Sequence, residues 1–201
     1  MILNVFLIFV FFICLAMIFS EGLWSATISL INVITAAMLA TNFFEPVATF
    51  LTNQATGLTF FWDFVAVWAV FIISLVVMQL ITGFLSRYRV RFKKPVDIAG
   101  GVFCAAWIGW IMMQFTLFTL HVSPLGKNFL AGSFQPEPTA RMFFGLAPDR
   151  NWLAFMHTMS ESGSLTRGSK DHVFDPRADF VLKYAARRQQ FEAEPKLTVG
   201  R

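Results

Sequence analysis

Four long apolar segments in the first 120 residues limit what this chain can fold into. They cover residues 2–20, about 24–44, about 60–83 and about 96–120. Each is close to the ~20 residues that an α-helix needs to cross the hydrocarbon core of a bilayer. Polar backbone groups in lipid must be satisfied within the structure, and the segments show no two-residue alternation, so helices are expected rather than strands. The sequence therefore predicts an all-α membrane protein with four transmembrane helices.

The boundaries of these helices follow from local signals. The first segment lacks a basic N-terminal region, and its end, AMIFSEG, offers no small-x-small cleavage site, so we interpret it as a retained helix rather than a signal peptide. Pro46 is expected to end the second helix, and Pro95 precedes the fourth.

Charge divides the chain into two parts. Residues 1–120 hold five of the 16 cationic side chains and four of the 12 anionic ones, and residues 121–201 hold the others. Only 14% of all residues are charged, against about a quarter in a typical soluble domain. We therefore expect a four-span transmembrane domain at 1–120 and an extramembrane C-terminal tail at 121–201.

The loop between the third and fourth helices indicates the orientation. It carries five cations within eight residues: Arg87, Arg89, Arg91, Lys93 and Lys94. Lys and Arg in short loops stay on the cytoplasmic side, so both termini are expected outside. The alternative role of these cations is contact with anionic lipid headgroups, worth about 1 kcal/mol per residue near the surface. The lipid bilayer is an expected partner, and nucleic acid is not, because the chain shows no nucleic-acid-binding module.

Small residues recur every fourth position at the start of the fourth helix and lie on one face of it. This seam consists of Asp97, Gly101, Ala105 and Gly109. The second helix carries a comparable stripe of Ser25, Ser29, Asn32, Ala36 and Ala40. Small residues let helix backbones approach closely in lipid, so we expect the two stripes to pack together. The alternative, a path between protomers lined by these helices, is less favoured because few polar groups lie at mid-depth.

Two carboxylates lie near the ends of predicted spans. Charged groups within a membrane segment are costly and suggest a function, but water reaches both of these positions. We expect Asp97 to cap the fourth helix and pair with Arg87 or Lys94, and Asp63 to cap the third helix.

Two helices are expected in the tail. One begins at Pro148, and its apolar face consists of Trp152, Phe155, Met156 and Met159. It either lies on the outer membrane surface with Trp152 at headgroup level or packs on the rest of the tail. The other is capped by Asp175, has Pro176 in its first turn, and docks on the membrane domain, another protomer or a partner.

The sequence offers no candidate catalytic, cofactor-binding or metal-binding residues. His157 and Glu161 are four residues apart on one predicted helix, but two side chains do not make a metal site, and a solvated helix face explains them. No phosphate-binding or dinucleotide-binding motif is present. No cofactor is expected, and an enzyme is not favoured.

The chain resembles the colicin V production protein family of bacterial inner-membrane proteins over roughly residues 1–120. Gly22 in SEGLWSATISL matches the glycine after the first span, and Asp97, Gly101 and Gly109 in DIAGGVFCAAWIGW match the start of the fourth. The chain departs from the family pattern where charged residues or glycine are common, at Glu21, Ser25, Ala26, Ala105 and Ile108. The resemblance implies a multi-pass inner-membrane protein linked to toxin export or envelope physiology, and it supplies no catalytic residue.

Together these patterns predict a non-enzymatic membrane subunit that forms a homo-oligomer or joins a membrane complex. The alternative is a channel or transporter component with a path lined by the second and fourth spans.

Overall fold

The computed structural model describes residues 1–54, 60–86, 90, 92–126, 129–135, 137, 139–161 and 173–193. In this part of the chain the fold is helical and contains no strand. The elements are α1 (Ile2–Ile18), α2 (Leu23–Gln54), α3 (Trp62–Leu85), α4 (Lys94–Val122), the short 3-10 turn η2 (Phe129–Gly132), α5 (Pro148–Glu161) and α6 (Phe180–Ala193).

Three of these helices are long and apolar enough to cross a membrane: α2, α3 and α4. The helix α1 is apolar but has only 17 residues, or about 26 Å, which is slightly short of the ~30 Å hydrocarbon core. The described residues thus contain three candidate spans and a shorter apolar helix, and the expected count of four spans is not confirmed.

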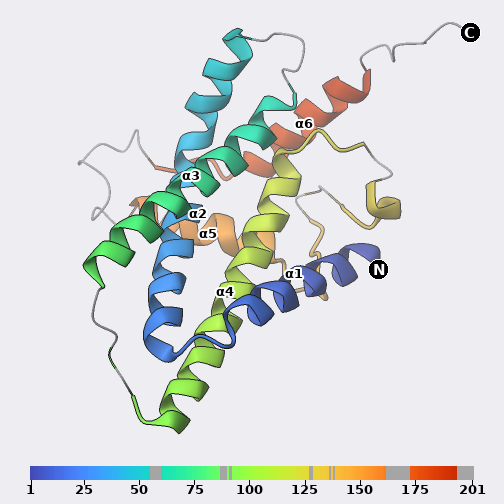
Figure 1. Ribbon diagram of the computed structural model, residues 1–201. Coiled ribbons are helices and arrows are strands. Elements are labelled where there is room, and N and C mark those ends of the chain that lie inside the picture. The colour runs from blue at the N-terminus through green and yellow to red at the C-terminus, as the bar shows by residue number, and fades with distance from the viewer. Residues whose placement is uncertain are drawn as a thin grey trace, which may run out of the picture.

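The prediction that Pro46 ends the second helix is wrong. The helix α2 continues through Pro46 to Gln54, and its C-terminal part extends past the ends of its neighbours (Figure 1). A proline inside a helix removes one hydrogen bond and costs about 3 kcal/mol. Burial of Phe44 and Ala48, one on each side of the proline, offsets that cost.

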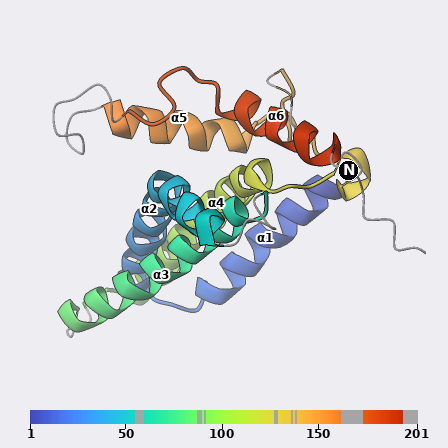
Figure 2. The same cartoon turned by 90° about the horizontal axis from the view of Figure 1, so that it is seen from above.

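The helices form three layers. The central helix α4 packs against α1 on one side and α2 on the other, and α3 packs mainly against α2. Figure 2 shows α1 and α3 in one outer layer, α2 and α4 in the middle, and α5 with α6 across the opposite side. The N-terminus lies beside the segment that follows α4, where the Met1 amino group donates to Ser133 Oγ at 3.1 Å.

Tail residues complete the hydrophobic cores of the membrane helices. In the larger core, Trp152 and Met156 of α5 and Phe180 and Tyr184 of α6 pack with buried residues of α2, α3 and α4. In the smaller core, Phe134 and Met142 pack between α1 and the C-terminal half of α4. The predicted transmembrane part and tail therefore share both cores.

The predicted helix at Pro148 forms and packs on α4, and it also contacts the rest of the tail, where the Phe174 backbone N–H donates to Ser160 Oγ at 2.9 Å. Trp152 and Met156 are each 1% exposed and point into the larger core, while Phe155 is partly buried and Met159 exposed. Nearly every residue of α4 from Ile111 to Val122 is buried, so this part of α4 needs cover on all sides. The helices α1 and α2 cover two sides, and α5 covers a third.

The last helix docks on the membrane helices, which is one of the three expected arrangements. It begins at Phe180, four residues later than Pro176 suggested. Asp175 still caps it, because its carboxylate accepts hydrogen bonds from the backbone N–H groups of Asp179 (2.9 Å) and Phe180 (3.3 Å).

Candidate functional site

Asp97 joins the start of α4 to the start of α2. Its Oδ1 accepts a hydrogen bond from the backbone N–H of Leu23 at 2.9 Å. The carboxylate therefore caps the N-terminus of α2, where it also meets the positive end of the helix dipole. Asp97 was expected to cap α4 itself, but no side chain caps the N-terminus of α4.

Glycines at this junction are required by close contact. A Cβ on Gly22 would lie 2.7 Å from Oδ2 of Asp97, and a Cβ on Gly101 would lie 2.5 Å from the backbone oxygen of Glu21. Both distances are shorter than real Cβ contacts, and the second neighbour is backbone that cannot rotate away. Gly22, Asp97 and Gly101, three of the four residues that carry the family resemblance, thus meet at one point.

The rest of the seam faces α1 as well. Gly109 lies against Phe11, whose backbone oxygen would be 3.0 Å from an added Cβ, and Ala105 is fully buried. The glycines of the seam therefore contact α1 and the α1–α2 turn, instead of the stripe on α2 proposed as their partner.

The stripe on α2 is divided among several neighbours. Asn32 Nδ2 donates to Thr82 Oγ1 of α3 at 2.9 Å, and Ser29 Oγ donates to Glu21 at 3.5 Å. Ala36 and Ala40 are fully buried in the larger core, and Ser25 is partly buried. The interface between α2 and α4 is a packed core.

At the opposite end, α6 neutralises the carboxylates of α2 and α3. Lys183 Nζ and Tyr184 Oη both donate to Glu45 Oε1, at 2.6 and 3.2 Å. Arg187 forms an ion pair with buried Asp63 at 2.8 Å. The sequence reading assigned Asp63 a capping role and did not find this partner. Two sequence signals could have suggested this ion pair: a single carboxylate near the end of a predicted span and a basic face on a later helix.

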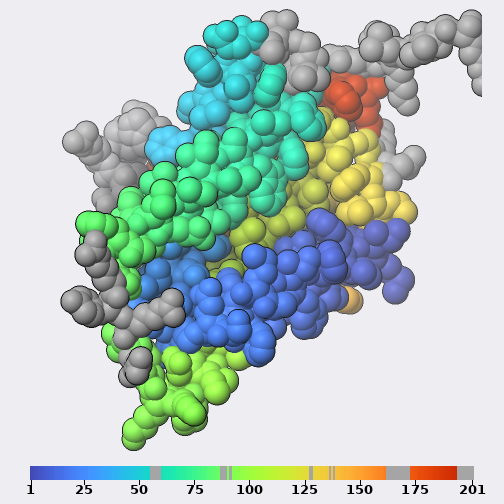
Figure 3. Space-filling model, viewed as in Figure 1, coloured from blue at the N-terminus to red at the C-terminus, as the bar shows by residue number. Residues whose placement is uncertain are grey.

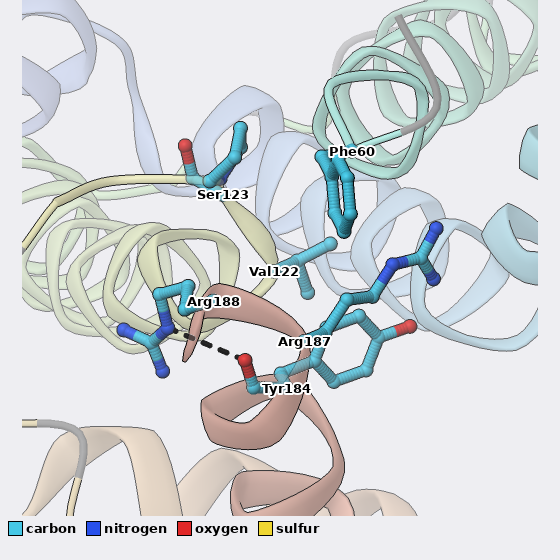
Figure 4. A pocket seen from close by; sticks show the side chains of 7 residues that line it. Phe60, Val122, Ser123, Tyr184, Arg187 and Arg188 are labelled. Atoms are coloured by element: carbon cyan, nitrogen blue, oxygen red, sulfur yellow. Dashed lines mark hydrogen bonds between the residues drawn. The ribbon is translucent and has the colours of Figure 1, made fainter. Parts of the chain in front are cut away.

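Arg188 points to the opposite side of α6 from Arg187 (Figure 4). Its Nε donates to the backbone oxygen of Tyr184 at 3.4 Å, and its guanidinium lies 5.1 Å from the centre of the Phe134 ring. The side chain is 7% exposed, and burial lowers its pKa to about 10. Burial also raises the pKa of Tyr184 well above its usual range.

A buried pair joins the end of α4 to the first turn of α5. His121 Nε2 and Asp149 Oδ2 are 2.9 Å apart, and each side chain is 1% exposed. Nearby, Trp152 Nε1 donates to Thr41 Oγ1 of α2 at 3.1 Å. Nothing in the sequence relates His121 to Asp149.

Lys93 and Lys94 are exposed at the start of α4, and Arg87, Arg89 and Arg91 lie outside the described residues. His157 Nδ1 is 2.9 Å from the backbone oxygen of Phe174, and its Nε2 is 3.9 Å from Glu161. Among the described side chains, no group of three His, Cys, Asp or Glu residues is placed to hold a metal.

Comparison with known proteins identifies the family. The model of the colicin V production protein family matches residues 3–138. None of the curated proteins or solved structures compared with the chain matches it. The family match includes the Gly22–Asp97–Gly101 junction and ends before α5 and α6 begin. Since it covers well over half of the sequence, the chain, a membrane protein with apolar spanning helices, belongs to the colicin V production protein family.

Proposed function

We propose that this chain is a non-enzymatic subunit of the bacterial inner membrane that self-associates through the outer face of α3 and serves export or envelope physiology. The observation that supports the proposal is a polar side chain and a glycine, Gln79 and Gly83, exposed one turn apart on this helix. The same face exposes Ile72, Val76 and Leu80. It lies open in the space-filling view (Figure 3).

Gly83 differs from Gly22 and Gly101, the two glycines that meet Asp97 at the motif junction. No atom lies within 4 Å of a Cβ added at Gly83, whereas Gly22 and Gly101 have neighbours closer than 3.0 Å. The fold of one chain therefore gives no steric reason for a glycine at 83. A second helix packed here would supply one, because glycine lets two backbones approach closely in lipid.

The side-chain amide of Gln79 gives a second reason to expect a helix packed on this face. The amide has no hydrogen-bond partner among the described residues. It lies about 9 Å from the end of α3, and an amide at this depth gains from an interhelical hydrogen bond. An amide both donates and accepts, so the same side chain from a second copy satisfies it in a two-fold symmetric interface.

The buried and partly buried polar groups support a structural role. Asp97, Asp63, His121 and Asp149 each connect one helix to another. Ile108, which stands where relatives commonly have a basic residue, is buried in the larger core. These groups stabilise the arrangement of helices that presents the α3 face.

The test is the oligomeric state of Gly83→Leu and Gln79→Leu, measured by native mass spectrometry after gentle extraction. We expect a homo-oligomer for the wild type, loss of it in Gly83→Leu, and about fivefold weaker association in Gln79→Leu, since such a hydrogen bond contributes about 1 kcal/mol. Ala99→Leu, a similar enlargement on the exposed side of α4, is the control. A wild-type oligomer that persists in Gly83→Leu would contradict the proposal.

A further inference from the structure

A groove separates α2 near Pro46 from the segment that leads into α6. Its volume is about 560 Å³, within the usual range for ligand pockets. Polar side chains from α2 and from this segment line most of the groove, and Phe44 and Phe180, which border it, are buried in the larger core. At the groove, α2 and α6 are joined by the Lys183–Glu45 ion pair.

The depth of the groove places it at a membrane surface. Glu45 lies about 33 Å along α2 from Leu23, slightly more than the ~30 Å thickness of the hydrocarbon core. Asp63 lies at a similar distance from the end of α3, so the same level is marked by a second helix. The groove is therefore at the level of lipid headgroups, on the opposite side of the membrane from Lys93 and Lys94.

The groove offers donors for a phosphate. Lys183 has three N–H donors, directs one at Glu45 Oε1, and remains half exposed, so further donors are available. Arg177, also lining the groove, is exposed and adds a guanidinium.

The groove also offers acceptors for a positively charged group. The Asp179 carboxylate is exposed one turn before Lys183. Pro46 has no N–H, so it cannot donate to the backbone oxygen of Asn42, and Asn42 lines the same groove. The Asp179 carboxylate and the Asn42 backbone oxygen can both accept hydrogen bonds from an ammonium group. A purely anionic ligand would instead bring its charge towards Asp179.

We propose that this groove binds the headgroup of a zwitterionic phospholipid that carries a primary ammonium group. Lys183 and Arg177 bind the phosphate, and Asp179 and the Asn42 carbonyl accept from the ammonium. The site is independent of self-association through α3.

The experiment places the full chain in nanodiscs of phosphatidylethanolamine or of its N-trimethylated analogue, phosphatidylcholine, and counts retained lipids by native mass spectrometry. We expect one tightly retained phosphatidylethanolamine and about tenfold weaker retention of phosphatidylcholine, which has the phosphate but no N–H donor. Equal retention of the two lipids, or stronger retention of anionic phosphatidylglycerol, would overturn the proposal.

Variants separate the two parts of the headgroup. Asp179→Asn should reduce the preference between the two lipids, and Arg177→Ala should weaken both equally. Arg141→Ala and Glu161→Gln, exposed charges outside the groove, are controls that should change neither. An unchanged preference in Asp179→Asn would contradict the assignment. Free glycerophosphoethanolamine should not displace the lipid at equal concentration, and displacement would assign the groove to a soluble ligand instead.

Discussion

The two ends of the helical bundle are held together by different physical means. At the motif end, Gly22 and Gly101 allow backbone to approach backbone, and one carboxylate caps a helix. At the tail end, α6 brings an arginine and a lysine to carboxylates on α3 and α2, and α5 brings a carboxylate to a histidine on α4. The family match covers the first end and stops before α5 and α6. Close packing tolerates almost no change in side-chain volume, whereas paired charges tolerate changes that keep the pair balanced.

The largest effect on folding is expected for Gly101→Leu at the motif end. The added side chain must enter space where a Cβ alone would be 2.5 Å from the Glu21 backbone oxygen. Overpacking in a core costs about 1–3 kcal/mol even where side chains can yield, so the cost against backbone is expected to exceed this range. We expect loss of folded, trypsin-resistant protein after extraction.

Gly83→Leu is the matched control for Gly101→Leu, because it makes the same substitution in open space. It should weaken association and leave the fold of one chain intact. If Gly101→Leu were as resistant to trypsin as Gly83→Leu, the close contact at the motif junction would be refuted.

The next largest effect is expected at the buried His121–Asp149 pair. His121→Leu keeps a side chain of similar size but leaves the Asp149 carboxylate buried without its partner, a loss of about 3–5 kcal/mol. Because the pair holds the first turn of α5, the amides of α5 should exchange with deuterium much faster in this variant.

The double variant His121→Leu/Asp149→Leu tests whether the pairing of these two buried polar groups is what matters at this end. Replacing both members of a buried pair by apolar residues is often nearly neutral, so exchange in α5 should return most of the way to wild type. Double-variant exchange as fast as that of His121→Leu would show that the two side chains act separately.

The sequence predicted the helices better than the contacts between them. Apolar runs located α2, α3 and α4, Pro148 located the start of α5, and Asp175 was correctly predicted to cap α6, because these signals are local. The prediction at Pro46 was wrong because tertiary packing of Phe44 and Ala48 outweighs the local preference of proline.

Long-range polar contacts were the main omission at the candidate site. His121 and Asp149 have no periodic relation in the sequence, so nothing local connects them. The Asp63–Arg187 pair was more accessible to inference, since a carboxylate at a span end requires a cation, but the sequence offers several cations in the tail and does not select Arg187. The Gly22–Asp97 contact was visible only as a family pattern.

The smallest effect on stability is expected for substitution of Arg188 at the tail end. Burial lowers the pKa of Arg188 to about 10, so the folded state favours loss of its proton relative to the unfolded chain. Stability from this group should therefore increase as pH rises above about 10, and at neutral pH the buried charge is a cost. Arg188→Met keeps the length and the contact with Phe134 while removing that cost, so the melting temperature should stay equal or rise slightly. A clear fall in melting temperature for Arg188→Met, with Arg188→Lys unchanged, would show that the positive charge itself stabilises the docking of α6.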